Sequence, residues 1–135
     1  MERWFFCAVT LLFFTGCSGA NDLLPTTKVD GSVSFQGIAL ESGTVTFFPI
    51  AGGKHAIGLI AKEGVFNLST YETGDGAILG KHKVVINVSY QMPDGKPAPD
   101  SVLRIPVKYT KLETTPLIVE VTLDSENQFR IKLEP

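Results

Sequence analysis

The sequence predicts an all-β protein, a sandwich of about seven antiparallel strands. Six segments after Lys28 alternate apolar and polar residues with a period of two, which is the pattern of half-buried strands. Glycine-containing turns separate these segments at spacings of about 8–12 residues. No long stretch shows the 3.6-residue period of an amphipathic helix. Two packed sheets are therefore the expected architecture.

The chain begins with a short apolar stretch that is typical of a signal peptide. Trp4–Phe14 spans about 11 residues, within the roughly 7–15 of a signal sequence and short of the about 20 that a transmembrane helix needs. Thr15 and Gly16 follow, and then Cys17. This arrangement resembles the signal peptide and lipobox of a bacterial lipoprotein, with Phe14 where an aliphatic residue is usual.

The resemblance implies that residues 1–16 are removed as a lipoprotein signal peptide and that Cys17 carries the lipid. An ordinary secretory signal and an uncleaved short anchor are the alternatives. Residues 17–27 are then the lipidated N-terminus and a flexible tether, and residues 28–135 the β-sandwich domain. The expected partner is a membrane, reached through the lipid at Cys17. The expected location is the bacterial cell envelope, at the outer membrane or its periplasmic face, because Ser18 follows the lipid site.

The expected strands follow in chain order, each ended by turn residues. They are Val29–Phe35, Thr44–Phe47, Ala56–Ala61, Phe66–Thr70, Val84–Val88, Val119–Leu123 and Phe129–Leu133. Ala56–Ala61 is apolar on both faces, which predicts a well-covered strand. Lys62–Gly64 predicts a tight hairpin turn. Tyr90–Tyr109 contains several prolines and predicts a long loop across one end of the sandwich.

Composition limits what holds the domain together and what it binds. The net charge of −2 gives no electrostatic reason to bind nucleic acid. Only two cysteines are present, Cys7 in the signal segment and Cys17 at the lipid site. The domain therefore has no disulfide and no thiolate zinc site, and it must be stabilised by packing and hydrogen bonds.

Several motifs, taken together, resemble the transthyretin-like and carboxypeptidase-regulatory-like β-sandwich domains. They are Val33–Leu40, Gly43–Pro49, Gly64–Leu68 and Gly80–Val84, with Ala39 where the family often has proline and His82 at its usual aromatic position. Thr70–Ala77 and Ile105–Tyr109 resemble a subgroup of short bacterial lipoproteins built from this domain alone. The resemblance implies the strand order and a domain that stabilises or binds and is seldom catalytic.

No catalytic, cofactor-binding or metal-binding residue is expected. The zinc peptidase motif, the Gly-x-Ser-x-Gly nucleophile turn and the Tyr-Arg-Gly-Ser ending of the transthyretin-like hydrolase are all missing from the sequence. His82 is expected to be a buried, hydrogen-bonded or edge histidine. The loop carboxylates Glu72, Asp75, Asp94 and Asp100 are interpreted as turn caps in preference to calcium ligands.

The sequence therefore favours a non-enzymatic, envelope-anchored lipoprotein that acts as a structural or binding module. The alternative is a module that binds a glycan or peptide through the 90–109 loop, with an envelope protein or glycan as partner. Tyr71, Tyr90 and Tyr109 are the candidate contact residues, although each ring can instead cover the end of the core. Strand addition at an exposed sheet edge is a further option.

Overall fold

The computed structural model describes residues 23–88, 104–123 and 126–135. The all-β sandwich is confirmed. The expected strands correspond to the strands of three or more residues, and within the described residues three two-residue strands and two 3-10 turns are additional. In chain order the elements are β1 (Thr26–Thr27), β2 (Val29–Phe35), β3 (Ile38–Ala39), β4 (Thr44–Pro49), β5 (Ala56–Leu59), η1 (Lys62–Gly64), β6 (Val65–Asn67), β7 (Ala77–Ile78), β8 (Gly80–Asn87), η2 (Val107–Thr110), β9 (Ile118–Val121) and β10 (Asn127–Leu133).

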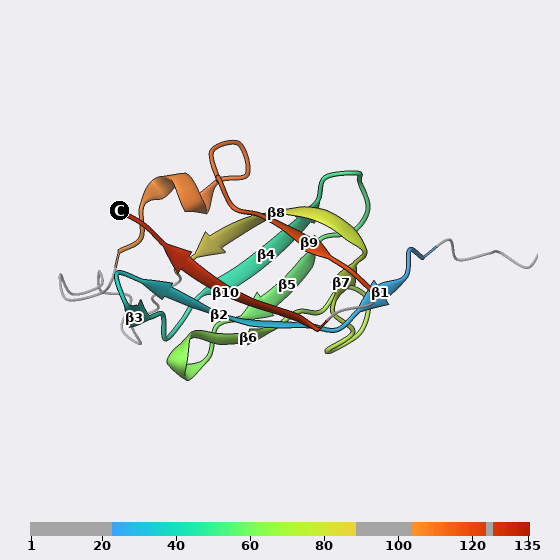
Figure 1. The fold of residues 1–135 in the computed structure, drawn as a ribbon, viewed down its shortest axis with the longest axis horizontal. Helices are drawn as coiled ribbons and strands as arrows, with labels where there is room; N and C mark the ends of the chain where they lie inside the picture. Colours follow the sequence, from blue (N-terminus) through green and yellow to red (C-terminus); the bar gives the residue numbers. More distant parts are fainter. Residues whose placement is uncertain (1–22, 89–103, 124–125) are drawn as a thin grey trace, which may run out of the picture.

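Two four-stranded sheets form the layers of the sandwich (Figure 1). One sheet has the order β5-β4-β8-β9. The other has the order β10-β2-β3, and β6 also pairs with β2. The short strands β1 and β7 pair at one end. Here the N-terminal segment enters the domain, while β3 and the C-terminus lie toward the opposite end (Figure 1).

One strand pair differs from the antiparallel arrangement that the sequence predicts. β10 runs parallel to β2 over the whole length of both strands, from Asn127 beside Val29 to Leu133 beside Phe35. These strands are far apart in the chain, so no hairpin turn forces them to be antiparallel. β10 instead enters its sheet from β9, the last strand of the facing sheet.

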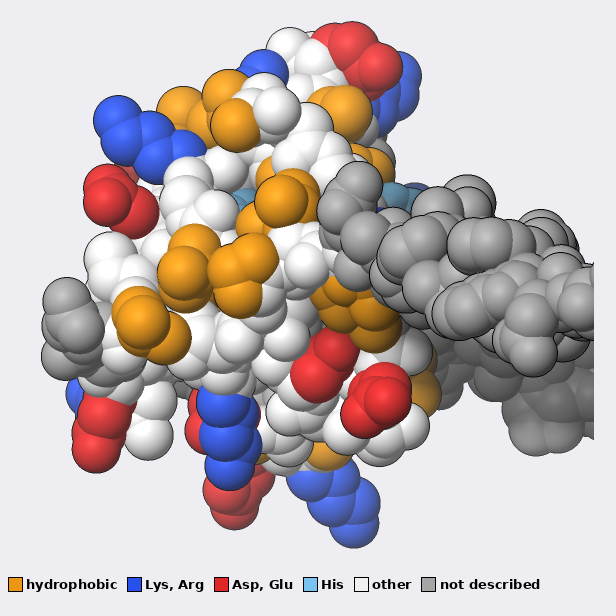
Figure 2. All heavy atoms as spheres, turned by 90° about the vertical axis from the view of Figure 1, so that its right-hand side faces the viewer, with side chains coloured by type: hydrophobic (Ala, Val, Ile, Leu, Met, Phe, Trp, Pro, Cys, Tyr) orange, Lys and Arg blue, Asp and Glu red, His pale blue; other side chains and the backbone are white. Residues whose placement is uncertain are grey.

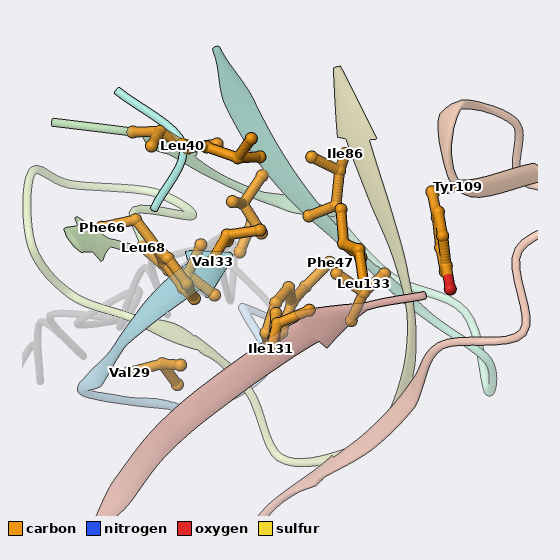
Figure 3. Close-up of a cluster of buried hydrophobic side chains, with 14 of the residues drawn as sticks. Val29, Val33, Leu40, Phe47, Phe66, Leu68, Ile86, Tyr109, Ile131 and Leu133 are labelled. Carbon is orange, nitrogen blue, oxygen red and sulfur yellow. The ribbon is translucent and has the colours of Figure 1, made fainter. Parts of the chain in front are cut away.

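The core lies between the two sheets and is built from the predicted alternating positions. Phe47 on β4 is fully buried at its centre. Its ring centroid lies 6.3 Å from that of Phe66 and 5.9 Å from that of Phe129, both on the facing sheet. Figure 3 shows the side chains of this cluster converging from both layers. Apolar packing across the sandwich therefore stabilises the fold.

β5 is less covered than the sequence predicts. Ile57 and Leu59 are 44% and 75% exposed. The expectation of a well-covered strand was wrong, because β5 is the last strand of its sheet and these two residues point away from the core. An apolar run on both faces does not reveal whether a strand is central or at an edge.

The tight turn after β5 joins the two layers. The N–H of Gly64 donates a 3.0 Å hydrogen bond to the carbonyl of Ala61, as a tight turn requires. However, β6 then pairs with β2 in the facing sheet, and one isolated bridge between Ile57 and Ser69 is the remaining pairing with β5. The predicted hairpin turn therefore connects strands of two different sheets and does not join two paired strands of one sheet.

The folded part begins before Lys28, inside the segment expected to be a flexible tether. Thr26 and Thr27 form β1, opposite Ile78 and Ala77. Gly76 permits this pairing, because its φ of +88° suits glycine and a Cβ there would collide with the backbone carbonyl of Thr27. In the parts of the chain described here, no helix is long and apolar enough to cross a bilayer.

Candidate functional site

An open groove lies on the outer face of the sheet that contains β10, β2 and β6. Its volume is about 620 Å³. The groove is lined by Asp30, Gly31, Ser32, Val65, Asn67, Gln128, Phe129 and Arg130. Five of these eight residues have polar side chains, so the groove offers hydrogen-bonding groups beside its apolar surface.

Strand register aligns the polar side chains of the groove in a row. Asp30 on β2 is paired with Gln128 on β10 and with Asn67 on β6. The next row holds Ser32 opposite Arg130. Strand residues two apart point to the same face, so these side chains share the outer surface of the sheet. The row combines a carboxylate with two amides.

One oxygen in this row has no partner among the described residues. The Oδ1 atom of Asp30 is buried and accepts no hydrogen bond within the structure described here. A buried acceptor without a partner costs about 1–3 kcal/mol. A ligand that donates a hydroxyl or amide hydrogen at this position would remove that cost, so Asp30 is the most informative residue of the groove.

Gly31 explains how the floor of the groove is built. A Cβ at this position would lie 2.6 Å from the Cζ atom of Phe66. The missing side chain lets the Phe66 ring pack directly beneath β2, where it is 1% exposed. The polar groove therefore lies over an aromatic layer of the core.

A second hollow runs along the other side of β10, between β10 and β9. Its volume is about 400 Å³, and its lining includes Leu117–Val119 and Gln128–Lys132. Each of these strands is the last strand of its sheet, so the hollow has the geometry that strand addition would use. The charged side chains of Arg130 and Lys132 are exposed on β10, and such charges on edge strands discourage pairing with another chain.

Of the candidate tyrosines, the structure describes Tyr71 and Tyr109, which lie on different elements. Tyr109 is 3% exposed, and its hydroxyl accepts a 2.9 Å hydrogen bond from the N–H of Glu134. Tyr71 is half-buried in the loop between β6 and β7, with the Lys54 Nζ atom 5.6 Å from its ring centroid. Tyr90 lies outside the described residues. Burial leaves Tyr109 little surface for a ligand, so its geometry matches the alternative role of covering the core.

Asp75 organises the loop between β6 and β7. Its carboxylate accepts hydrogen bonds from the N–H groups of Thr70, Tyr71 and Glu72, at 2.7, 2.9 and 3.0 Å. Desolvation by burial acts to raise the pKa of Asp75, but these backbone hydrogen bonds together lower the pKa below its ordinary value. The turn-capping interpretation of Asp75 is confirmed, while Asp94 and Asp100 lie outside the described residues.

His82 is a core residue. Its side chain is fully buried, and its Nε2 atom lies 2.6 Å from the carbonyl oxygen of Ile78. The Nδ1 atom is buried and has no hydrogen-bond partner in the part of the chain that the structure describes. The ring centroid lies 5.7 Å from that of Phe47. The expectation of a buried, hydrogen-bonded histidine is therefore confirmed.

The sequence interpretation did not single out the groove residues. Asp30, Asn67 and Gln128 come from three strands that are distant in the chain, and each has the ordinary outward position of an alternating strand. The available signal was a run of polar outward positions on β2 and β10. Strand order was needed to join them into one surface.

Across residues 23–88, 104–123 and 126–135, no group of three or more His, Cys, Asp or Glu side chains is placed to hold a metal ion. A scan against protein-family models, a search of curated proteins and a search of solved structures found no match to this chain.

Proposed function

We propose that this protein is a non-enzymatic lipoprotein of the bacterial cell envelope, which displays a β-sandwich as a structural or binding module. The observation that carries the proposal is Cys17 placed directly after Thr15 and Gly16, at the end of an apolar run of signal-peptide length. Each buried CH₂ of an acyl chain contributes about 0.8 kcal/mol, so two or three chains hold a protein stably on a bilayer.

The position of the sandwich in the chain agrees with this proposal. Strand β1 begins at Thr26, so a short stretch of chain separates Cys17 from the folded domain. Apolar packing between its two layers stabilises the described part of the domain. A domain of this kind suits display close to a membrane surface.

The resemblance to transthyretin-like domains is part of the proposal and has a structural correlate. In the motif Gly64–Leu68, Phe66 and Leu68 are each 1% exposed, as core positions of a sandwich strand should be. His82, at the family's aromatic position, fills the core beside Phe47. The ionisable side chains Asp75 and His82 thus have roles in a turn and in the core.

Replacement of the lipid site tests the proposal. The wild-type protein and Cys17→Ala are expressed in a bacterium, with Ser18→Ala as the matched control. We expect membrane-bound wild-type and Ser18→Ala proteins whose N-terminal peptide has the mass of an acylated Cys17. Cys17→Ala should lose both the acyl mass and cleavage at this position. If Cys17→Ala stays membrane-bound and is cleaved at the same position, the proposal is wrong.

The Oδ1 atom of Asp30, which has no hydrogen-bond partner among the described residues, favours a second function for the same module. This function is the binding of a glycan or peptide amide in the groove over β2. In this proposal the binding surface is formed by β2, β6 and β10 and not by the 90–109 loop, most of which lies outside the described residues. A hydrogen bond to a charged group contributes about 1.5–3 kcal/mol, which corresponds to roughly 10-fold or more in affinity. Glycan-array binding that falls by that factor in Asp30→Ala and Gln128→Ala, and not in Lys62→Ala on η1, would support it. Equal binding by all these variants would exclude the groove.

A further inference from the structure

Exposed apolar side chains gather at the end of the sandwich where the N-terminal segment enters. Leu23, Leu24, Ile50 and Leu123 are 59%, 46%, 52% and 69% exposed; together they are called the apolar end. Figure 2 views the molecule from this side and shows hydrophobic side chains across the face, with most charged side chains toward its rim. A folded domain rarely leaves such a group of large apolar side chains in water without a use.

Three segments of the chain meet at the apolar end. A Cβ on Gly53 would lie 3.1 Å from the Cδ1 atom of Leu24 and 3.0 Å from that of Ile78, so both side chains lie over this glycine. The N–H of Ile50 donates a 2.9 Å hydrogen bond to the carbonyl of Lys81. These contacts bring the N-terminal segment and the β4–β5 turn together beside β7.

The third segment follows β9. Val121 is paired with Gly80, the first residue of β8, which lies two residues after Ile78. Leu123, two residues beyond the end of β9, therefore lies at the same end of the sandwich. The cluster is assembled by the tertiary structure, because its members are separated by up to a hundred positions in the chain.

The short segment between Cys17 and the domain limits how far the apolar end can lie from a lipid at Cys17. Leu23 lies six positions after Cys17 in the chain, and at about 3.5 Å per position the fully extended reach is about 20 Å. A domain held by lipid at Cys17 therefore keeps the apolar end within that distance of the bilayer. Because the attachment is this short, the bilayer has a high effective concentration at the apolar end. The bilayer is therefore favoured as the occupant over a partner that arrives by diffusion.

The rim of this end has side chains suited to a lipid headgroup region. Tyr71 is half-buried, and the Lys54 Nζ atom lies 5.6 Å from its ring centroid. Tyrosine and lysine have an apolar body with a polar tip, and such side chains are enriched where hydrocarbon meets water. The headgroup region is therefore the surface that Tyr71, a candidate contact residue, would contact.

We propose that the apolar end, formed by Leu23, Leu24, Ile50 and Leu123, docks on the lipid bilayer to which Cys17 is anchored. This inference rests on the proposed lipidation of Cys17. Docking would direct the opposite end of the sandwich, with β3 and η2, away from the membrane. A bilayer is favoured over a second copy of the chain because the tether places it next to these residues.

Tryptophan fluorescence can test this directly. Trp4 is the only tryptophan of the chain and lies in the segment expected to be removed, so one introduced tryptophan reports alone. Ile50→Trp places it on the apolar end, and Ile38→Trp on β3 is the matched control, because the two isoleucines are 52% and 58% exposed. The purified, processed full-length product of each variant is reconstituted into phosphatidylcholine vesicles with and without brominated acyl chains, which quench tryptophan on contact.

The expected result is loss of most of the emission of Ile50→Trp in brominated vesicles, while Ile38→Trp keeps its emission. Acylated protein in which Ile50→Trp is not quenched, or in which both tryptophans are quenched equally, overturns docking and leaves the proposed anchoring intact. A concentration-dependent change in Ile50→Trp emission without quenching would identify a second copy as the occupant and also overturn docking. An N-terminal mass without acyl chains overturns the proposed anchoring and docking together.

Discussion

The Nε2 atom of His82 lies 2.6 Å from the carbonyl oxygen of Ile78, inside the core of the sandwich. A carbonyl oxygen can only accept, so Nε2 carries the proton and donates this hydrogen bond. The bond holds the beginning of β8 against β7, next to the end of the domain where the N-terminal segment enters. A polar side chain thus has a defined place in a mostly apolar core.

We expect His82→Ala to destabilise the protein by about 3 kcal/mol or more. The substitution leaves a cavity beside Phe47 and removes the partner of the Ile78 carbonyl. Urea unfolding followed by circular dichroism measures the change. Lys81→Ala, at the exposed neighbouring position, should alter stability by less than about 0.5 kcal/mol. Equal stability of the two variants would show that the His82 side chain is dispensable to the core.

Alanine substitutions at the two glycines of the β6–β7 loop distinguish the cost of a strained backbone from the cost of a steric collision. Gly74 and Gly76 have φ values of +77° and +88°, but a Cβ would meet nothing within 4 Å at Gly74 and would collide with the Thr27 backbone at Gly76. Gly74→Ala should cost about 1–2 kcal/mol from the left-handed backbone alone. Gly76→Ala should cost clearly more and free β1 from β7. Hydrogen exchange of the β1 amides checks this, and equal loss in both variants would contradict it.

The Asp75 turn should make stability depend on acid. Because the pKa of Asp75 is lowered in the folded state, its contribution is present above the unfolded pKa, near 4, and is lost as the pH falls through the folded pKa. Asp75→Asn should therefore be less stable than wild type by about 1 kcal/mol at pH 7, an amount that allows for solvent screening. The difference should shrink toward pH 2.

Urea unfolding at pH 7 and at pH 2 measures both values for Asp75→Asn and for the control Glu72→Gln. Glu72 is exposed in the same turn, and its N–H is one of the donors to Asp75. Its own side chain should therefore contribute little at either pH. A stability difference for Asp75→Asn that is as large at pH 2 as at pH 7 would exclude a role for the carboxylate charge.

The Tyr109 hydroxyl links η2 to the C-terminal end of β10. It accepts a 2.9 Å hydrogen bond from the N–H of Glu134, and the ring is buried. Tyr109→Phe keeps the ring and removes this acceptor, so we expect a loss of about 0.5–1.5 kcal/mol and faster hydrogen exchange at the Glu134 amide. Tyr71→Phe, in the loop between β6 and β7, is the control and should leave that amide protected. Unchanged exchange in Tyr109→Phe would mean that the bond is not formed in solution.

The strand positions follow from the sequence because each depends on local alternation. In β2, Val29 and Val33 are fully buried while Ser32 and Ser34 face outward, as a period of two requires. His82 could be placed in the core for the same reason, since it shares the phase of Val84 and Ile86 on β8. Asp75 could be recognised as a turn residue from the glycines beside it.

The pairing of strands could not be predicted in the same way. The apolar run of β5 indicated burial on both faces, yet its edge position leaves Leu59 exposed. The groove residues Asp30, Asn67 and Gln128 became a group only through the register of three strands. The parallel pairing of β10 with β2 has no local signal, because the chain between them passes through both sheets.

The amino-acid sequence by itself determined the fold class, the main strands and the position of Cys17 after a signal-like segment, because these depend on residues close together in the chain. Only the tertiary structure decided which strands lie at edges, which polar side chains share the groove and which apolar side chains meet at the N-terminal end. Contacts between distant residues depend on how two sheets stack and close, and that arrangement minimises exposed apolar surface over the whole domain at once. No single segment contains that information.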